Sequence, residues 1–126
     1  MYKVMMFLKR RADVSFAEFR HHYETSHAVL GQKYLGHLLQ SYTRNYNADC
    51  AQERNVDTSA SGAFDGPLCP YDCVTEWVLA DEGAFAEAVR ILSDPQVAEV
   101  FREDERHFLD QSATRSMQCE ISDTVK

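Results

Sequence analysis

The sequence predicts an α+β domain in which four strands form one antiparallel sheet and two helical regions cover one of its faces. Four stretches have the length and apolar content of strands, and two regions have apolar residues at helical spacing. They follow one another as strand, helix, strand, strand, helix, strand. At 126 residues, the chain is expected to form a single domain, 1–126, whose core needs no disulfide or metal.

The first strand is expected over 2–9, because Val4 to Leu8 is an apolar run with residues for both faces of a sheet. A helix is expected to begin after Ser15, because Ser15 and Glu18 have the spacing of a capping box. Aromatic residues then recur at helical spacing, namely Phe16, Phe19 and Tyr23. A bend or a second short helical piece is expected at Ser26.

Three further strands are expected over 38–46, 71–79 and 113–121, where polar and apolar residues alternate or β-formers gather. Between the first two of these, 47–70 is expected to be a long loop insertion, because it is rich in Ala, Ser, Asp, Asn and Gly and has weak periodicity. Loops of this length inside a compact domain are usually functional or mobile. This one is expected either to close over a cleft or to contact a partner subunit.

The second helical region is expected to begin near Glu82 and to restart at Asp94, with Asp94 as N-cap and Pro95 in the first turn. The complete order is that of the ferredoxin-like βαββαβ arrangement. Its helices cover one face of the sheet, yet the first strand carries apolar residues on both faces, Val4 on one and Phe7 on the other. We therefore expect a homodimer whose sheets pack face to face. The alternative is a monomer with a more polar second face.

The charge and the motifs exclude several classes of function. Lys and Arg number 13 against 20 Asp and Glu, a net charge of −7, which argues against nucleic acid or an anionic membrane as partner. Neither a membrane-spanning run nor a signal-peptide pattern is present, so we expect a cytoplasmic protein. The four cysteines form no CxxC pair, and no metal, nucleotide or flavin motif occurs. We expect no cofactor and no metal, although haem stays open because it needs only one histidine.

Several segments together resemble the EthD domain family. They are a strand ending in Lys9-Arg10, the helix that begins after Ser15, the pair Tyr23-Glu24-x-x-His27 with an apolar segment behind it, and the run from Asp104 to Met117. The resemblance covers most of the chain except 47–70 and implies the dimeric α+β barrel fold. Relatives in this superfamily include cofactor-free polyketide cyclases, aromatic decarboxylases, dehydratases, lactone isomerases, monooxygenases and haem-degrading enzymes. Other members are accessory proteins of degradation systems with no assigned reaction.

His27 is the first catalytic candidate, because an imidazole beside aromatic walls can move protons near neutral pH. The alternative is a helix-end histidine that only caps carbonyls. Tyr23, one helical turn before it, and Tyr42 are candidates to hold the oxygen of a developing enolate. Further candidates for substrate contact are Phe7, Phe19, Tyr46, Trp77, Asp104 and His107. Of these, Asp104 could orient a histidine or face water, and the aromatic residues could equally be plain core. His21 and His22 are expected at the surface.

The leading hypothesis is a small cofactor-independent enzyme of lyase or isomerase type. It would act by general acid–base chemistry on a hydrophobic small molecule, a cyclic or aromatic carbonyl compound, through cyclisation, dehydration, decarboxylation or isomerisation. One alternative is a cofactor-free monooxygenase of an electron-rich phenol. The other is a binding protein that holds a hydrophobic ligand for another enzyme.

Overall fold

The computed structural model describes residues 1–52 and 68–125, and its four strands and two main helical regions follow one another in the predicted order. The four strands are β1 Tyr2–Leu8, β2 Leu39–Tyr46, β3 Cys73–Leu79 and β4 Arg115–Cys119. They form one sheet in the order β2-β3-β1-β4, and every neighbouring pair is antiparallel. This is the strand order of the ferredoxin-like arrangement, so the predicted fold class is confirmed.

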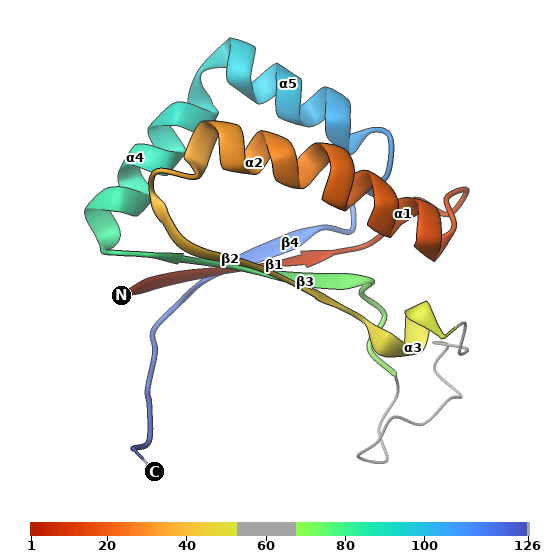
Figure 1. The fold of residues 1–126 in the computed structure, drawn as a ribbon, viewed down its shortest axis with the longest axis horizontal. Coiled ribbons are helices and arrows are strands. Elements are labelled where there is room, and N and C mark those ends of the chain that lie inside the picture. Colours follow the sequence, from red (N-terminus) through yellow and green to blue (C-terminus); the bar gives the residue numbers. More distant parts are fainter. Residues whose placement is uncertain (53–67, 126) are drawn as a thin grey trace.

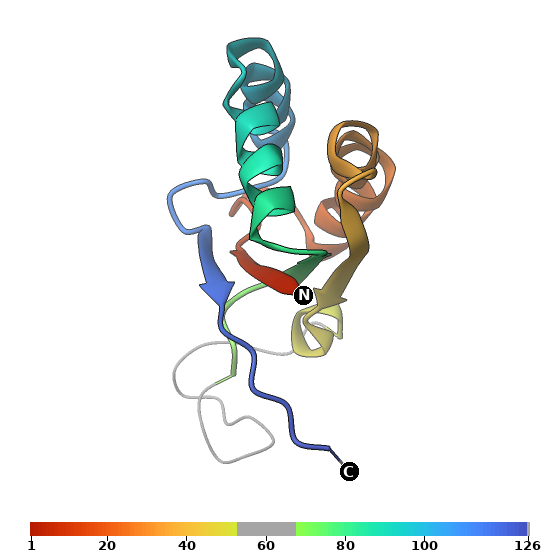
Figure 2. The same ribbon diagram turned by 90° about the vertical axis from the view of Figure 1, so that its left-hand side faces the viewer.

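Two helical layers cover the same face of the sheet (Figure 1). The first is continuous and consists of α1 Phe16–His22, the π-helical segment η1 Tyr23–His27 and α2 Ala28–Leu35. The second consists of α4 Glu82–Ser93 and α5 Pro95–Glu105. Figure 2 shows the two layers standing side by side on this face, with the C-terminal residues running away from the sheet on its other side.

The predicted helix starts are confirmed by hydrogen bonds. The Ser15 hydroxyl oxygen accepts from the Glu18 backbone N–H at 3.1 Å. Asp94 accepts from two backbone N–H groups of the first turn of α5, at 3.0 and 3.3 Å, and Pro95 occupies that turn. Such caps satisfy N–H groups that have no partner within the helix, and each contributes about 1 kcal/mol.

The predicted loop over 47–70 begins with a short helix, α3 Ala48–Ala51, which the sequence analysis did not anticipate. Asn47 explains this helix, because its side-chain oxygen caps the Asp49 N–H at 2.9 Å. Its amide nitrogen donates to the Tyr71 carbonyl at 2.8 Å and so joins the two ends of the loop. The predicted role of this loop, as a lid or as a partner contact, depends on residues 53–67, which lie outside the described residues.

The core between helices and sheet consists of two clusters. The first lies around Phe19 and contains Leu8, Phe19, Tyr23, Ala28, Cys73, Phe108 and Leu109. The second lies near the other end of the sheet and contains Val4, Leu35, Leu79 and Ala88. Met6 and Tyr42 pack against the first cluster, and Trp77 and Leu92 pack against the second. All four line a cavity that is described below.

Among the residues that the structure describes, both helical layers lie on one face of the sheet and leave its opposite face without a helical layer (Figure 1). The strand registers place Met5, Phe7, Val74, Val78 and Met117 on it, beside an ion pair of Lys3 with Glu76. We refer to this surface as the bare face. Within the described parts of the chain, no helix has the length and apolar character needed to cross a membrane.

Candidate functional site

A buried carboxylate on α5 collects three side chains from the first helical layer. Asp104 lies near the end of α5, and its side chain is 10% exposed. Its Oδ2 atom accepts a hydrogen bond from Nδ1 of His27 at 2.9 Å. Its Oδ1 atom accepts from Nε2 of His22 at 3.0 Å and from the Ser26 hydroxyl at 2.5 Å. Asp104 therefore ties α5 to both α1 and η1.

The charge of Asp104 determines which nitrogen of His27 carries the proton. Burial raises the pKa of the Asp104 carboxyl, but hydrogen bonds from Ser26 and His27 and the nearby His22 outweigh burial and lower this pKa below its usual range. An ionised carboxylate can only accept hydrogen bonds, so neutral His27 carries its proton on Nδ1. Its Nε2 then has a free lone pair. An imidazole held in this tautomer by a carboxylate can act as a general base.

The π-helical segment explains how three side chains reach one carboxylate. The Ala28 N–H donates to the Tyr23 carbonyl, five residues earlier. In an α-helix, with about 3.6 residues per turn, residue i+5 points about 140° away from residue i. A π-turn closes at i+5, so side chains four and five positions apart lie on one side of it. Ser26 and His27 therefore both lie beside His22. Of the two predicted alternatives at Ser26, a bend or a second short helical piece, the structure has further helical segments, η1 and α2.

His27 also lines a cavity between the helices and the sheet. The cavity has a volume of about 360 Å³, which lies in the range of small-molecule sites. Its sheet-side residues are Met6, Tyr42 and Trp77, and its helix-side residues are His27, Gly31, Leu92, Ala98, Phe101, Arg102 and Glu105. Most of this lining is apolar or aromatic. The cavity thus suits a hydrophobic ligand that presents a few polar groups.

The phenol of Tyr42 lines this cavity, and the phenol of Tyr23, which lies outside the cavity, forms a hydrogen bond with it. The Tyr42 hydroxyl donates to the Tyr23 hydroxyl at 3.1 Å, which in turn lies 2.7 Å from Oγ1 of Thr75. Burial raises the pKa of both phenols, so both stay protonated at neutral pH. Tyr23 is 2% exposed and does not line the cavity. Of the two phenols, Tyr42 is the one that a ligand in the cavity can contact.

Gly31 allows Tyr42 to lie close to the helix. A Cβ atom at Gly31 would come within 2.9 Å of Cε2 of Tyr42, closer than real Cβ contacts. Gly31 follows His27 by four residues, one helical turn along the same face. The absence of a side chain here therefore sets the distance between the helix that carries His27 and the strand that carries Tyr42.

An ion pair lies on the solvent side of Tyr42. Arg44 donates to Glu24 through Nε at 2.5 Å and Nη2 at 3.1 Å, and its guanidinium carbon lies 4.8 Å from the centre of the Tyr42 ring. The Tyr46 hydroxyl donates to the same carboxylate at 2.5 Å. The hydrogen bond from Arg44 holds the pKa of Glu24 below its usual value, whereas burial and the bond to Glu24 raise the pKa of Tyr46. This pair supports the outer side of the Tyr42 ring.

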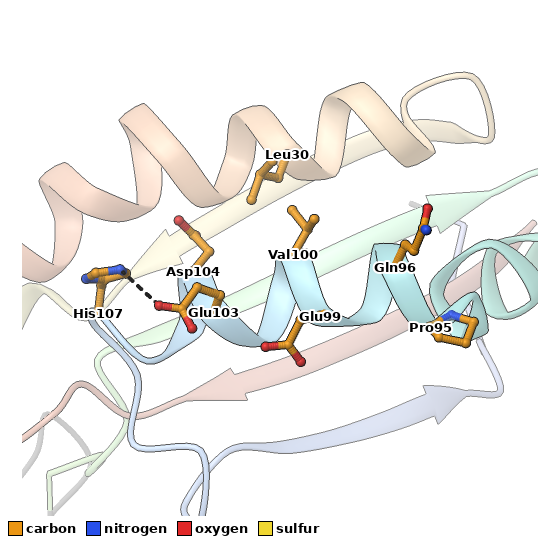
Figure 3. A pocket seen from close by; sticks show the side chains of 8 residues that line it. All are labelled: Leu30, Pro95, Gln96, Glu99, Val100, Glu103, Asp104 and His107. Atoms are coloured by element: carbon orange, nitrogen blue, oxygen red, sulfur yellow. Dashed lines mark ion pairs between the residues drawn. The ribbon is translucent and has the colours of Figure 1, made fainter.

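A shallow groove of about 740 Å³ runs along the outside of α2 and α5. Figure 3 shows Leu30 and Val100 facing each other across it, with Asp104 and His107 at one end. The His107 ring stacks on the His22 ring at 5.6 Å, and its side chain is 62% exposed. Asp104 thus lines the outer groove while it binds His27, which lines the cavity.

The structure places only some of the predicted site residues together. His27, Tyr42 and Trp77 line the cavity, and Tyr23 and Asp104 hydrogen-bond to cavity residues from behind. The Trp77 indole N–H is buried without a partner among the described residues. The cavity therefore brings together His27 and Tyr42, two polar residues named from the sequence, with Arg102 and Glu105, which were not named. The functional role of His27 and Tyr42 stays a prediction.

Four predicted contact residues lie elsewhere. The expectation for Phe7 is wrong, because Phe7 is on the bare face and Met6 takes its place in the cavity. Phe19 is fully buried among core aromatic rings. Tyr46 is engaged with the ion pair described above, and His107 lies in the outer groove.

Two residues of the site were not predicted as such. His22 was expected at the surface, but its side chain is 26% exposed and bound to Asp104. Ser26 was predicted only to mark a bend or a second short helical piece. The α-helical repeat does not place His22 and Ser26 on the same side of the helix as His27, and nothing in the sequence marks a π-turn. Gly31, in contrast, could have been found from its spacing to His27.

Two histidines and one carboxylate also occur in metal sites. Within residues 1–52 and 68–125, no group of three or more His, Cys, Asp or Glu side chains is arranged to hold a metal ion. In the described arrangement, the two imidazoles instead point N–H groups at the carboxylate.

Solved structures of low sequence identity share this fold. An EthD family protein from Bacillus halodurans, BH0200, has a TM-score of 0.60 at 16% identity, with 97% of this chain and 100% of that chain covered. At3g17210 from Arabidopsis thaliana has a TM-score of 0.59 at 14% identity, with both chains covered completely. HapK from Hahella chejuensis has a TM-score of 0.52 at 10% identity, covering 100% of this chain and 99% of its own. No curated protein matches the sequence.

These structures show the fold alone, whereas the match of the sequence to a family identifies the family. The profile of the EthD domain matches residues 11–112, a range that includes both helical layers, strands β2 and β3 and the residues around Asp104. The match extends over most of the 126 residues and includes three of the segments that resemble the family, namely the helix after Ser15, the Tyr23-Glu24-x-x-His27 segment and Asp104. The chain belongs to the EthD domain family.

Proposed function

We propose that the protein is a cofactor-independent enzyme of lyase or isomerase type that moves protons on an apolar cyclic or aromatic carbonyl compound. The observation that carries the proposal is the His27–Asp104 pair at the wall of an apolar cavity. In this proposal, Nε2 of His27 removes a proton from the carbon next to the carbonyl group and later returns it. Proton transfer by a positioned side chain accelerates such steps about 10²- to 10⁴-fold.

Tyr42 has the second role in the proposal. Proton removal leaves negative charge on the carbonyl oxygen, which needs a hydrogen-bond donor in a site that excludes water. The Tyr42 phenol stays protonated and lines the same cavity as His27. It donates to the substrate oxygen when it turns away from Tyr23. Cyclisation, dehydration and isomerisation can pass through an enolate formed by proton removal. Decarboxylation forms its enolate by loss of CO₂, and the carbon then takes up a proton. Both routes place negative charge on the carbonyl oxygen, so the geometry supports this class of chemistry.

The proposal can be tested with 2-tetralone, a bicyclic ketone with exchangeable α-protons. NMR in deuterated buffer measures the loss of these protons, with and without the protein. We expect the protein to accelerate exchange and His27→Ala to lower the protein-dependent rate by at least about 10²-fold. His37→Ala is the matched control, because His37 is exposed and does not line the cavity. Exchange that is unaffected by His27→Ala would contradict the assignment of the base.

The same experiment separates the two alternatives. If 2-tetralone shifts the NMR signals of cavity residues but its exchange is not accelerated, the result favours a protein that binds a hydrophobic ligand for another enzyme. The apolar lining of the cavity supports that alternative. A monooxygenase would consume O₂ when an electron-rich phenol such as 1-naphthol is added, which an oxygen electrode measures.

The bare face supports a second part of the proposal, a homodimer. Five apolar side chains lie on this face, and Met117 is 49% exposed in the single chain. A second copy of the sheet, packed face to face, removes this surface from water.

Four free cysteines fit a reducing compartment, and the cytoplasmic location is part of the proposal too.

Light scattering after size-exclusion chromatography tests the dimer. Met5 lies at the middle of the bare face, between Glu76 and Met117 in the strand registers. Met5→Glu places a charge in the proposed interface and is expected to halve the molar mass. Val89→Glu, on the outer side of α4, is the matched control, because Val89 is 45% exposed. A wild-type protein with the mass of one chain would refute the dimer.

A further inference from the structure

His22 does not line the cavity, yet it shares a carboxylate with the residue that does. Asp104 divides its two oxygens, with Oδ2 facing His27 and Oδ1 facing both His22 and Ser26. The two imidazoles therefore approach one negative charge from two sides, at 2.9 and 3.0 Å. The π-turn is what makes this arrangement possible, because an α-helix would point one of the rings away.

Two imidazoles on one carboxylate cannot gain protons independently. Neutral His22 donates one hydrogen bond to Asp104 and leaves its negative charge available to stabilise a charged His27. A protonated His22 neutralises that charge and adds a like charge beside His27. Each ring therefore makes protonation of the other less favourable, and the pair takes up its protons in two linked steps.

We propose that His22 is a positioning residue for His27, acting through Asp104, and that it couples the protonation of the two histidines. His22 fixes the carboxylate by holding Oδ1, so that Oδ2 meets Nδ1 of His27. When His22 is neutral, Asp104 supports proton uptake by Nε2 of His27. When His22 is charged, this support is reduced. Proton uptake by His27 therefore becomes less favourable as the solution becomes acidic and His22 gains its proton.

Other charged and aromatic groups surround the pair. Arg102 and Glu105 of α5 line the cavity together with His27. The His107 ring stacks on His22 and itself lies 3.9 Å from the Glu103 carboxylate. The ring of Phe108 contacts both histidines and is not titratable. His27 also meets the edge of the Tyr23 ring, whose phenol remains protonated. Exposed His107 is thus the main additional group whose charge reaches His22.

NMR titration of the histidine side chains tests the inference on the wild-type protein without substrate. We expect the signals of His22 and His27 each to show two inflections, as linked groups do. In His22→Gln, which retains an N–H donor but cannot titrate, His27 is expected to follow a single curve. Its midpoint should rise by about 1 pH unit or more, the effect of removing a like charge several ångströms away, because two groups titrate in separate steps only when they interact this strongly.

His21→Gln is the matched control, because His21 is the exposed neighbour of His22 on α1. It should leave both curves unchanged, and His107→Gln should alter the His22 curve without removing the linkage. Independent single curves for His22 and His27 in the wild type would overturn the inference, whether or not the variants fold. So would a His27 curve that is the same in the wild type and His22→Gln.

The inference deepens the proposed function, because it concerns the same base. Its failure is distinguishable from a failure of that function, since the titration needs no turnover. Linked titration without 2-tetralone exchange would reject the proposed chemistry and leave the His22–Asp104–His27 coupling in place. Exchange that depends on His27 with unlinked titration would do the opposite.

Discussion

Replacing Asp104 by alanine is expected to destabilise the fold by about 3 kcal/mol at pH 7. The substitution removes the acceptor of three hydrogen bonds and leaves the Ser26 hydroxyl and two imidazoles without a partner. Hydrogen bonds to charged groups contribute about 1.5–3 kcal/mol each. The cost of burying the carboxylate offsets a large part of this sum, since its side chain is 10% exposed.

The contribution of Asp104 should also depend on pH. Its pKa in the folded state lies below its usual value, so it stabilises the fold fully above the pKa of an unfolded aspartate, about 3.9. This stabilisation is lost as the pH falls through the lower pKa of the folded state. The difference in stability between wild type and Asp104→Ala should therefore shrink as the pH falls from 5 to 3.

Urea unfolding followed by circular dichroism measures both effects. Glu103→Ala is the control, because Glu103 is the neighbouring residue on α5 and its side chain is 60% exposed. Exposed ion pairs contribute little, so this variant should change stability by less than about 1 kcal/mol. A loss below about 1 kcal/mol for Asp104→Ala at pH 7 would refute the structural argument. A difference that does not shrink toward pH 3 would refute the protonation argument.

Three further results are expected. Tyr23→Phe should lower the free energy of unfolding by about 1–2 kcal/mol in urea unfolding, because it leaves two buried hydroxyl groups without their shared partner. Gly31→Ala should displace the Tyr42 ring, seen as shifted ring signals in NMR, and reduce ligand binding in the cavity without unfolding the protein. Burial raises the pKa of the Cys73 thiol to about 11, so Cys73 should react with a thiol reagent at pH 8 at least about 100-fold more slowly than exposed Cys69.

Much of the fold follows from local patterns in the sequence. The Ser15 and Asp94 caps are local signals, and the apolar stripes of both helical layers give the sides that pack on the sheet. The strand β1 shows the limit of such patterns. Its apolar run from Val4 to Leu8 has no alternation, so nothing in the sequence tells which residues face the helices. Phe7 was placed in the cavity for this reason, although Met6 lies there.

The candidate site was predictable where it depends on single residues and unpredictable where it depends on helix geometry. His27 and Tyr42 stood out through their chemistry. His22 did not, because its role requires a helix that gains one residue in a turn, and side-chain positions beyond that point cannot be read from an α-helical repeat. Asp104 was noticed as an acidic residue on an apolar stripe, but its partners come from a helix almost eighty positions earlier, at 77, 78 and 82 residues.

The cavity between the helices and the sheet lowers the stability of the fold but leaves room for a ligand. A protein interior of this size gains stability when its voids are filled, and a void lined by apolar side chains forfeits dispersion contacts. A larger side chain at Ala98, on the cavity wall, would fill part of the cavity and is expected to raise the melting temperature. The same change would exclude a ligand. Resistance to heat and space for a ligand are therefore opposing demands on the residues that line this cavity.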